Sequence, residues 1–102
     1  MFDTTIAAIS TALAPGAISI VRVSGEDAIS IVQSIFNKDI TKAKSYTMHY
    51  GYIIDENKQP VDEVLVSIFR APKTYTREDI VEINCHGGVY ITRKILTMVL
   101  SH

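Results

Sequence analysis

The apolar residues of this chain recur with two different periods, and this division limits the possible folds more than any other feature of the sequence. Five short runs are rich in β-branched and aromatic residues and therefore predict strands. These runs span residues 4–10, 17–23, 46–55, 61–70 and 80–85. The segments 26–36 and 89 onward repeat apolar residues at close to 3.6-residue intervals and predict helices. The order ββαββ-βα predicts an α+β domain with one mixed five-stranded sheet and helices packed on one side.

Turn-forming residues separate these runs. Pro15 and Gly16 suit the two central positions of a type II turn, which would join the first two strands as a hairpin. The polar tract 56–60 predicts the bend of a second hairpin. Ser24 or Gly25 is expected to cap the first helix.

Size, charge and composition exclude several classes of protein. With 102 residues, of which 47% are apolar, the chain can fill one core and is too apolar to be disordered. A net charge of −1 gives no overall attraction for nucleic acid or anionic membranes. The chain has a single cysteine, lacks the basic and then apolar order of a secretory signal, and has no apolar run near the roughly 20 residues of a membrane helix. These features predict a cytosolic protein without a membrane partner. Because the last helix has no stop signal, the expectation is one domain over 1–102, cut from a longer protein.

Arg22 and Glu82 stand out because each interrupts an otherwise apolar strand. A guanidinium or carboxylate in such a strand is costly unless it is paired. Two-residue alternation places Glu82 and Asn84 on one face of their strand and Cys85 on the other. Two interpretations stay open: the two charges pair with each other, or they face a cavity and hold a polar ligand.

The stretch Cys85-His86-Gly87-Gly88 could carry chemistry in two ways. A thiol–imidazole pair is unfavourable because adjacent strand residues point to opposite faces, so Cys85 is expected to be a buried small apolar residue. The glycine pair could let backbone N–H groups bind a ligand at a helix N-terminus, or it could only form a tight turn, and the turn is the preferred interpretation.

Other ligand classes receive little support. The histidines and the cysteine lack the spacing of metal ligands, so no metal site is predicted. Neither nucleotide-binding glycine motif, G-x-x-x-x-G-K-[ST] or G-x-G-x-x-G, is present. The basic residues outside the strands are expected to be solvated, with a phosphate contact as the alternative. They are Lys38, Lys42, Lys44, Lys73, Arg77, Arg93 and Lys94.

Four stretches together resemble a known family. They are I-A-A-I-S-T at 6–11, G-A-I at 16–18, I-V-R-V-S-G at 20–25 and A-P-K-T-Y-T-R-E-D-I-V-E-I-N-C-H-G-G at 71–88. The sequence is similar in these stretches to the N-terminal domain of the MnmE family of tRNA modification GTPases, also called TrmE or ThdF. The resemblance extends over essentially the whole chain, and the last stretch is its most specific part.

The resemblance implies a fold of the tetrahydrofolate-binding type and a domain that forms homodimers and binds a one-carbon tetrahydrofolate, formyl or methylene. It implies folate contacts at Arg22, in I-V-R-x-S-G, and at Glu82, in E-D-x-x-E. In the full-length family, a GTPase that uses GTP, Mg and K acts with MnmG (GidA) to install aminomethyl or carboxymethylaminomethyl groups on the wobble uridine of tRNA. No catalytic residue falls within these 102 residues, which are expected to lack GTPase activity.

The sequence departs from the usual family pattern in its first loop and in one turn. The departures are Ala12, Ala14, Pro15, Ser19 and Arg77, the last of which replaces a common Gly. Two other functions stay open: a purely structural module that dimerises through its sheet, with Arg22 and Glu82 as an interfacial ion pair, and a small thiol enzyme using Cys85.

Overall fold

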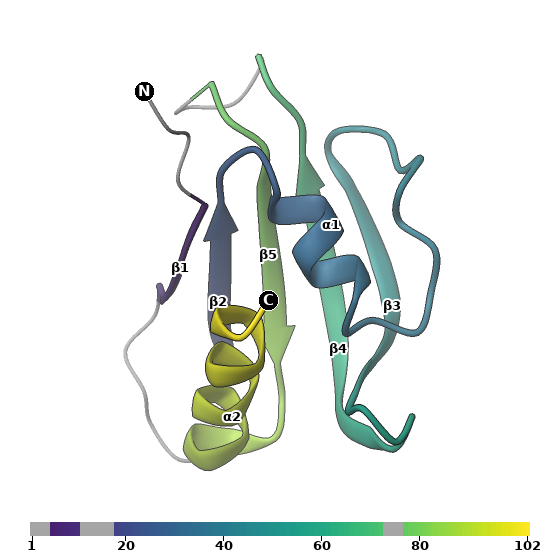
Figure 1. Cartoon of the computed structure of the whole chain (residues 1–102), viewed down its shortest axis with the longest axis vertical. Helices are drawn as coiled ribbons and strands as arrows, with labels where there is room; N and C mark the ends of the chain where they lie inside the picture. Colours follow the sequence, from purple (N-terminus) through teal and green to yellow (C-terminus); the bar gives the residue numbers. More distant parts are fainter. Residues whose placement is uncertain (1–4, 11–17, 73–76) are drawn as a thin grey trace.

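The computed structural model describes residues 5–10, 18–72 and 77–102, and within them one antiparallel sheet carries two helices. In chain order the elements are β1 (Ile6–Ile9), β2 (Ser19–Ser24), α1 (Ala28–Gln33), β3 (Thr47–Ile54), β4 (Pro60–Phe69), β5 (Ile80–Cys85) and α2 (Gly88–Leu100). The strands are ordered β1-β2-β5-β4-β3 across the sheet. Both helices lie on the same face of it (Figure 1). The predicted α+β class, with five strands in one sheet and helices on one side, is confirmed.

One part of the fold prediction is wrong: the sheet is not mixed. All four strand pairings are antiparallel. The strands β2 and β4 run in the same direction, but β5 inserts between them and is antiparallel to both. The crossover from β2 through α1 leads to β3 at the far edge, so no two parallel strands become neighbours.

Alternation along the strands separates a buried face from an open one. The odd-numbered residues of β2 and β5 and the even-numbered residues of the central part of β4 point toward the helices and form the core. The fully buried strand residues of the core are Val21, Val23, Ile53, Val64, Val66, Ile68, Val81, Ile83 and Cys85. From the helices, Val32 and Ile95 are fully buried against them. Since these residues are β-branched or small, they suit the pleated surface on which they pack.

The first helix is shorter than its apolar period predicts. It begins after Asp27 rather than after Ser24 or Gly25, and no side chain caps it. Gly25 still continues the pairing of β2 with β5, because its N–H donates to the Asp79 carbonyl at 2.9 Å. Its φ of 142° then turns the chain sharply. The helix can start only once this turn is complete.

The same helix also ends early, because its last residues turn toward the sheet. Phe36 forms a β-bridge with Ile53, and the Ile54 N–H donates to the Ile35 carbonyl at 2.8 Å. Backbone pairing with the edge strand β3 therefore replaces the last predicted helical turn.

Only one of the two predicted turns lies within the described residues. The Pro15-Gly16 turn lies outside the described residues. The 56–60 bend is confirmed: Asp55 Oδ1 accepts the N–H groups of Asn57 and Gln59, both at 2.9 Å. Lys58 adopts a positive φ of 62° at its end.

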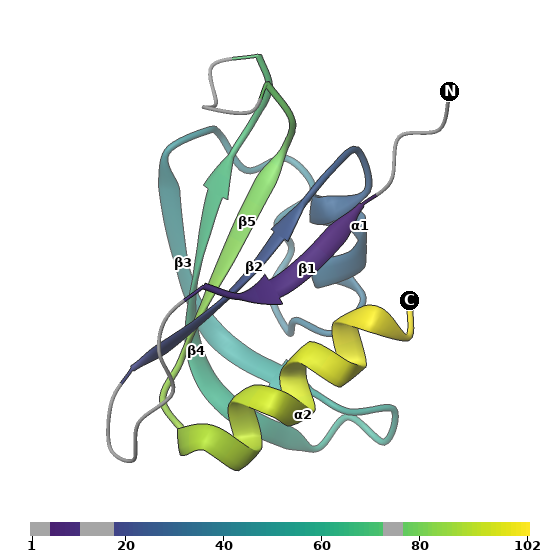
Figure 2. The ribbon, with the colours of Figure 1, turned by 90° about the vertical axis from the view of Figure 1, so that its left-hand side faces the viewer.

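The opposite face of the sheet carries no helix within the described residues, and Figure 2 shows both helices on one side only. This open face presents exposed aromatic and apolar side chains along β3, which forms one edge of the sheet. Its centre is formed by β2 and β5, the two strands that carry the charged residues singled out by the sequence.

Candidate functional site

The strand register brings the two anomalous charges together. Arg22 on β2 and Glu82 on β5 are direct cross-strand partners. Both lie on the open face, because their neighbours Val21, Val23 and Val81 point into the core. Mutual pairing is one of the two interpretations that the sequence leaves open, and the antiparallel pairing of β2 with β5 makes the two residues neighbours.

The two side chains form an ion pair. Arg22 Nε and Nη2 both donate to Glu82 Oε2, at 2.9 and 2.5 Å. The Arg22 side chain is 51% exposed and the Glu82 side chain 19%. An exposed pair of this kind contributes only about 0–1 kcal/mol to stability, so stability alone gives a weak reason for two charges in apolar strands. The first interpretation from the sequence, mutual pairing, is what the structure shows.

This pairing leaves hydrogen-bonding capacity unused. The guanidinium is bound through Nε and Nη2, so Nη1 remains available. On the carboxylate, only Oε2 has a partner among the described residues, and Oε1 has none. The pair therefore presents donors and an acceptor to whatever lies on the open face.

Two uncharged polar residues flank the pair on the same face. Ser67 on β4 is the other cross-strand partner of Glu82. Asn84 follows two residues later on β5 and is partly buried. Neither side chain forms a hydrogen bond with a described residue. The four residues Arg22, Ser67, Glu82 and Asn84 are called the polar cluster below.

Apolar side chains surround the polar cluster. Ala8 is the cross-strand partner of Arg22, Met48 of Ser67, and both Ile20 and Leu65 are partners of Asn84. A small set of polar groups within an apolar surface is the composition typical of sites that bind organic ligands.

Cys85 is not placed for chemistry. It is fully buried on the core face, and its Sγ lies 3.5 Å from the Ile83 carbonyl oxygen. Burial, together with the negative charge of Asp62, raises the pKa of the thiol to about 12. A neutral buried thiol is a poor nucleophile, so the expected role of a small apolar residue is confirmed.

The backbone N–H groups of the His86-Gly87-Gly88 turn already bind an acidic side chain of the same chain. Asp62 Oδ2 accepts the N–H of His86 at 2.8 Å and that of Gly87 at 3.2 Å. His86 Nδ1 donates to the Glu63 carbonyl at 2.9 Å. Gly88 begins α2 with a φ of 86°. The turn interpretation therefore holds. Asp62 stabilises this turn, a contact that the sequence does not predict because it depends on the pairing of β4 with β5.

The basic residues of the loop after α1 are exposed, as expected. They are Lys38, Lys42 and Lys44. Arg77, Arg93 and Lys94 are also exposed, whereas Lys73 lies outside the described residues. In the part of the chain that the structure describes, no three histidine, cysteine or acidic side chains gather as metal ligands. No helix among the described residues is long and apolar enough to cross a membrane.

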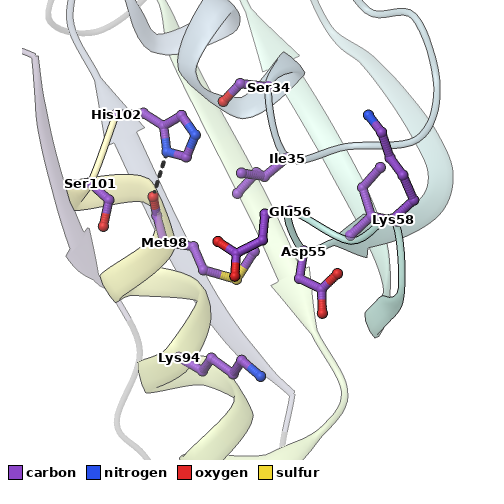
Figure 3. A pocket seen from close by; sticks show the side chains of 10 residues that line it. Ser34, Ile35, Asp55, Glu56, Lys58, Lys94, Met98, Ser101 and His102 are labelled. Carbon is purple, nitrogen blue, oxygen red and sulfur yellow. Dashed lines mark hydrogen bonds between the residues drawn. The ribbon is translucent and has the colours of Figure 1, made fainter.

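A separate cavity of about 370 Å³ lies on the helix side, between the end of α2 and the β3–β4 turn (Figure 3). Ile35, Ile54 and Met98 are among its lining residues, and both signs of charge surround it. Asp55 is engaged by the turn amides, and His102 Nδ1 donates to the Met98 carbonyl at 2.8 Å. Neither Arg22 nor Glu82 lines this cavity.

The fold and the polar cluster define a class: an α+β domain that keeps one sheet face open and concentrates its polar groups there. A family model described as "GTP-binding protein TrmE N-terminus" matches residues 5–102. This chain belongs to that family, as the resemblance predicted.

Three similar proteins share one name. The chain is 62% identical to the tRNA modification GTPase MnmE of Bacillus cytotoxicus over 98% of this chain and 22% of that protein. The MnmE proteins of Bacillus mycoides and Lactobacillus helveticus are 60% and 56% identical, over 98% and 99% of this chain and 22% of each relative. The chain thus spans 22% of the length of these relatives.

Proposed function

We propose that this chain is the folate-binding and dimerising domain of a tRNA modification GTPase. Arg22 and Glu82 would hold a one-carbon tetrahydrofolate, formyl or methylene, on the open face of the sheet. The observation that carries the proposal is the pairing of these two residues with hydrogen-bonding capacity left over, in a chain that belongs to the TrmE N-terminal family.

The residues present fit this cofactor. The amino-pyrimidine edge of a pterin carries two adjacent N–H donors, and a carboxylate is the side chain whose oxygens accept both. Glu82 keeps Oε1 free, and the guanidinium of Arg22 fixes the orientation of the carboxylate through Oε2. The bound folate would supply the one-carbon unit, while the chain binds, orients and shields it.

The longer protein to which such a domain belongs would be a cytoplasmic GTP hydrolase that requires Mg and K. It would act with MnmG to add aminomethyl or carboxymethylaminomethyl groups to the wobble uridine of tRNA. The 102 residues encode no phosphate-binding loop, so GTP binding and hydrolysis are expected to require other parts of the protein.

Calorimetric titration with 5-formyltetrahydrofolate tests the proposal. Glu82→Gln replaces one acceptor by a donor that faces a ligand donor, so affinity should fall by about 1–3 kcal/mol, or roughly 5- to 150-fold. Arg22→Ala should weaken binding comparably, because it frees the Glu82 carboxylate to rotate. Glu56→Gln, in the β3–β4 turn and among the residues lining the other cavity, is the control and should leave affinity unchanged.

Sedimentation of the same proteins separates the proposal from the purely structural alternative. If Arg22 and Glu82 serve only as an interfacial ion pair, both substitutions lower dimer affinity and leave folate affinity unchanged. That result would defeat the assignment of the two residues to a folate site.

A further inference from the structure

We propose that Asn84 is a specificity-determining residue of the same site and that its side-chain NH₂ donates to the 4-oxo group of the pterin. This inference rests on the proposed function. It starts from a partly buried carboxamide with no hydrogen-bond partner among the described residues. Its polar atoms are not among the buried side-chain atoms that lack a partner, so water can satisfy them in the unliganded chain, and a ligand beside the ion pair can take the place of this water.

The position of Asn84 agrees with this role. It lies on the same face of β5 as Glu82, two residues and about 7 Å further along the strand. Its cross-strand partners Ile20 and Leu65 are apolar and offer no side-chain hydrogen bond. The polar groups on β5 therefore follow one another along the strand, with the carboxylate first and the carboxamide second.

The edge of a pterin has a matching order. The 2-amino group and N3–H are donors, and the adjacent 4-oxo oxygen is an acceptor. Glu82 can accept the two donors, and the group next to it must then donate. Asn84 supplies that donor, whereas Ser67, on the other side of Glu82 across the strands, lies off the β5 row.

Arg22 is the competing donor, since its Nη1 is also available. The ion pair favours Asn84. Two N–H groups of Arg22 already converge on Glu82 Oε2, and moving the guanidinium onto the 4-oxo oxygen would disturb that arrangement. The carboxamide of Asn84 can bind the ligand without breaking any existing contact.

The test exploits a change at the 4-position of the ligand. Tetrahydroaminopterin carries an amino group where tetrahydrofolate carries the 4-oxo oxygen, so a donor replaces an acceptor there. Its N3 also lacks the hydrogen of tetrahydrofolate, but this change faces Glu82 both in the unmodified chain and in the variant and therefore cancels in the comparison. Asn84→Asp removes the donor of the side chain and leaves only acceptors. The ratio of the two affinities should shift toward tetrahydroaminopterin by about 10-fold or more in Asn84→Asp relative to the unmodified chain. Because both ligands meet the same added negative charge, its general repulsion cancels in the ratio.

Asn57→Asp, in the exposed β3–β4 turn, makes the same chemical change away from the polar cluster and should leave the ratio unchanged. Asn84→Ala is the second variant, for use if Asn84→Asp does not fold. It should weaken tetrahydrofolate binding about 10-fold without changing the melting temperature or the dimer affinity. Calorimetry under anaerobic conditions and sedimentation provide these readouts.

The outcomes are distinguishable. An unchanged ratio in Asn84→Asp, with Glu82→Gln still weakening tetrahydrofolate binding, overturns the role of Asn84 and leaves the proposed function standing. A loss of dimer affinity without any change in ligand affinity assigns Asn84 to an interface and also overturns it. If the unmodified chain binds neither ligand, the proposed function and the role of Asn84 fall together.

Discussion

At the scale of single residues, position in the sheet decides which groups are available for chemistry. Cys85 and Asn84 are neighbours in the sequence, yet the thiol is fully buried in the core and the carboxamide lies on the open face. Alternation along a strand is sufficient to separate them. The thiol loses its reactivity because it is desolvated, and the carboxamide keeps its hydrogen-bonding capacity because no strand neighbour uses it.

Cys85 should therefore react slowly with thiol reagents. It is the only cysteine, so labelling with a disulfide reagent at pH 8 reports on this position alone. In the folded chain the rate should be limited by opening of the structure and should rise as urea increases the opened population. Fast labelling in the absence of urea would contradict the buried position and revive the thiol-enzyme alternative.

The Cys85 thiol also makes the free energy of unfolding depend on pH. Its pKa rises from 9.0 to about 12 on folding, chiefly because of burial. Its contribution to stability is thus complete below about pH 9 and is lost as the pH rises toward 12, because the unfolded chain releases the proton first. Urea unfolding measured across this range, with Cys85→Ala as the reference, should show the steeper alkaline loss in the unmodified chain.

The sequence could predict the unusual residues of the site but only part of the site itself. Arg22 and Glu82 were recognisable because charges are costly in apolar strands. Asn84 was placed on the correct face by alternation, but its lack of a partner depends on the side chains of β2 and β4. Asp62 could not be found, because its contact with His86 and Gly87 joins residues more than twenty positions apart.

At the scale of elements, local patterns predicted each strand and helix, and contacts distant in sequence set their limits. The period of α1 continues to Phe36, but pairing of Phe36 with Ile53 on β3 competes with the last helical turn. The sheet was expected to be mixed because no local signal announces that β5 inserts between β2 and β4. Strand order is a property of the whole chain and is not encoded in any single run.

Gly25 tests how strongly the junction between β2 and α1 is constrained. A Cβ at this position would lie 2.5 Å from the Cα of Thr5, and the φ is 142°. Gly25→Ala should combine the strain of a positive φ with a backbone clash. Gly88→Ala is a matched control, since its φ is 86° but nothing lies within 4 Å of the added Cβ.

Urea unfolding should show a loss of about 1–2 kcal/mol for Gly88→Ala. Gly25→Ala should lose a further ~1–3 kcal/mol, because β1 must move away to admit the new methyl group. Equal losses in the two variants would mean that β1 yields without cost, and the junction would then impose no steric limit.

At the scale of the whole molecule, the open sheet face must be covered or solvated. Its exposed side chains concentrate on the edge strand β3 and the residue before it. They are Tyr46, Met48, Tyr50 and Tyr52, called the aromatic strip below. The rings of Tyr50 and Tyr52 lie 6.1 Å apart edge to face, and both hydroxyls are directed to the Glu63 carboxylate. This contact raises the pKa of Tyr50 and holds both rings in place.

If the chain forms the proposed homodimer, we expect the aromatic strip to be the contact surface. In a twofold interface the same surface patch of both subunits is in contact, so one lysine substitution places two positive charges in the interface. Met48 is 59% exposed and absent from the core. Met48→Lys should therefore raise the dimer dissociation constant at least about 10-fold without lowering the melting temperature of the dilute monomer.

Leu100→Lys provides the matched control for this prediction. Leu100 is 63% exposed, comparable to Met48, but it lies at the end of α2 on the helix side of the sheet. Replacing it by lysine adds the same charge to the opposite face and should leave the dimer intact in sedimentation velocity across a concentration series. If both variants dissociate to the same extent, net charge rather than the aromatic strip controls association. If only Met48→Lys dissociates, the open face is the contact between subunits, and the polar cluster lies on the same face, where a bound folate and the partner subunit would meet.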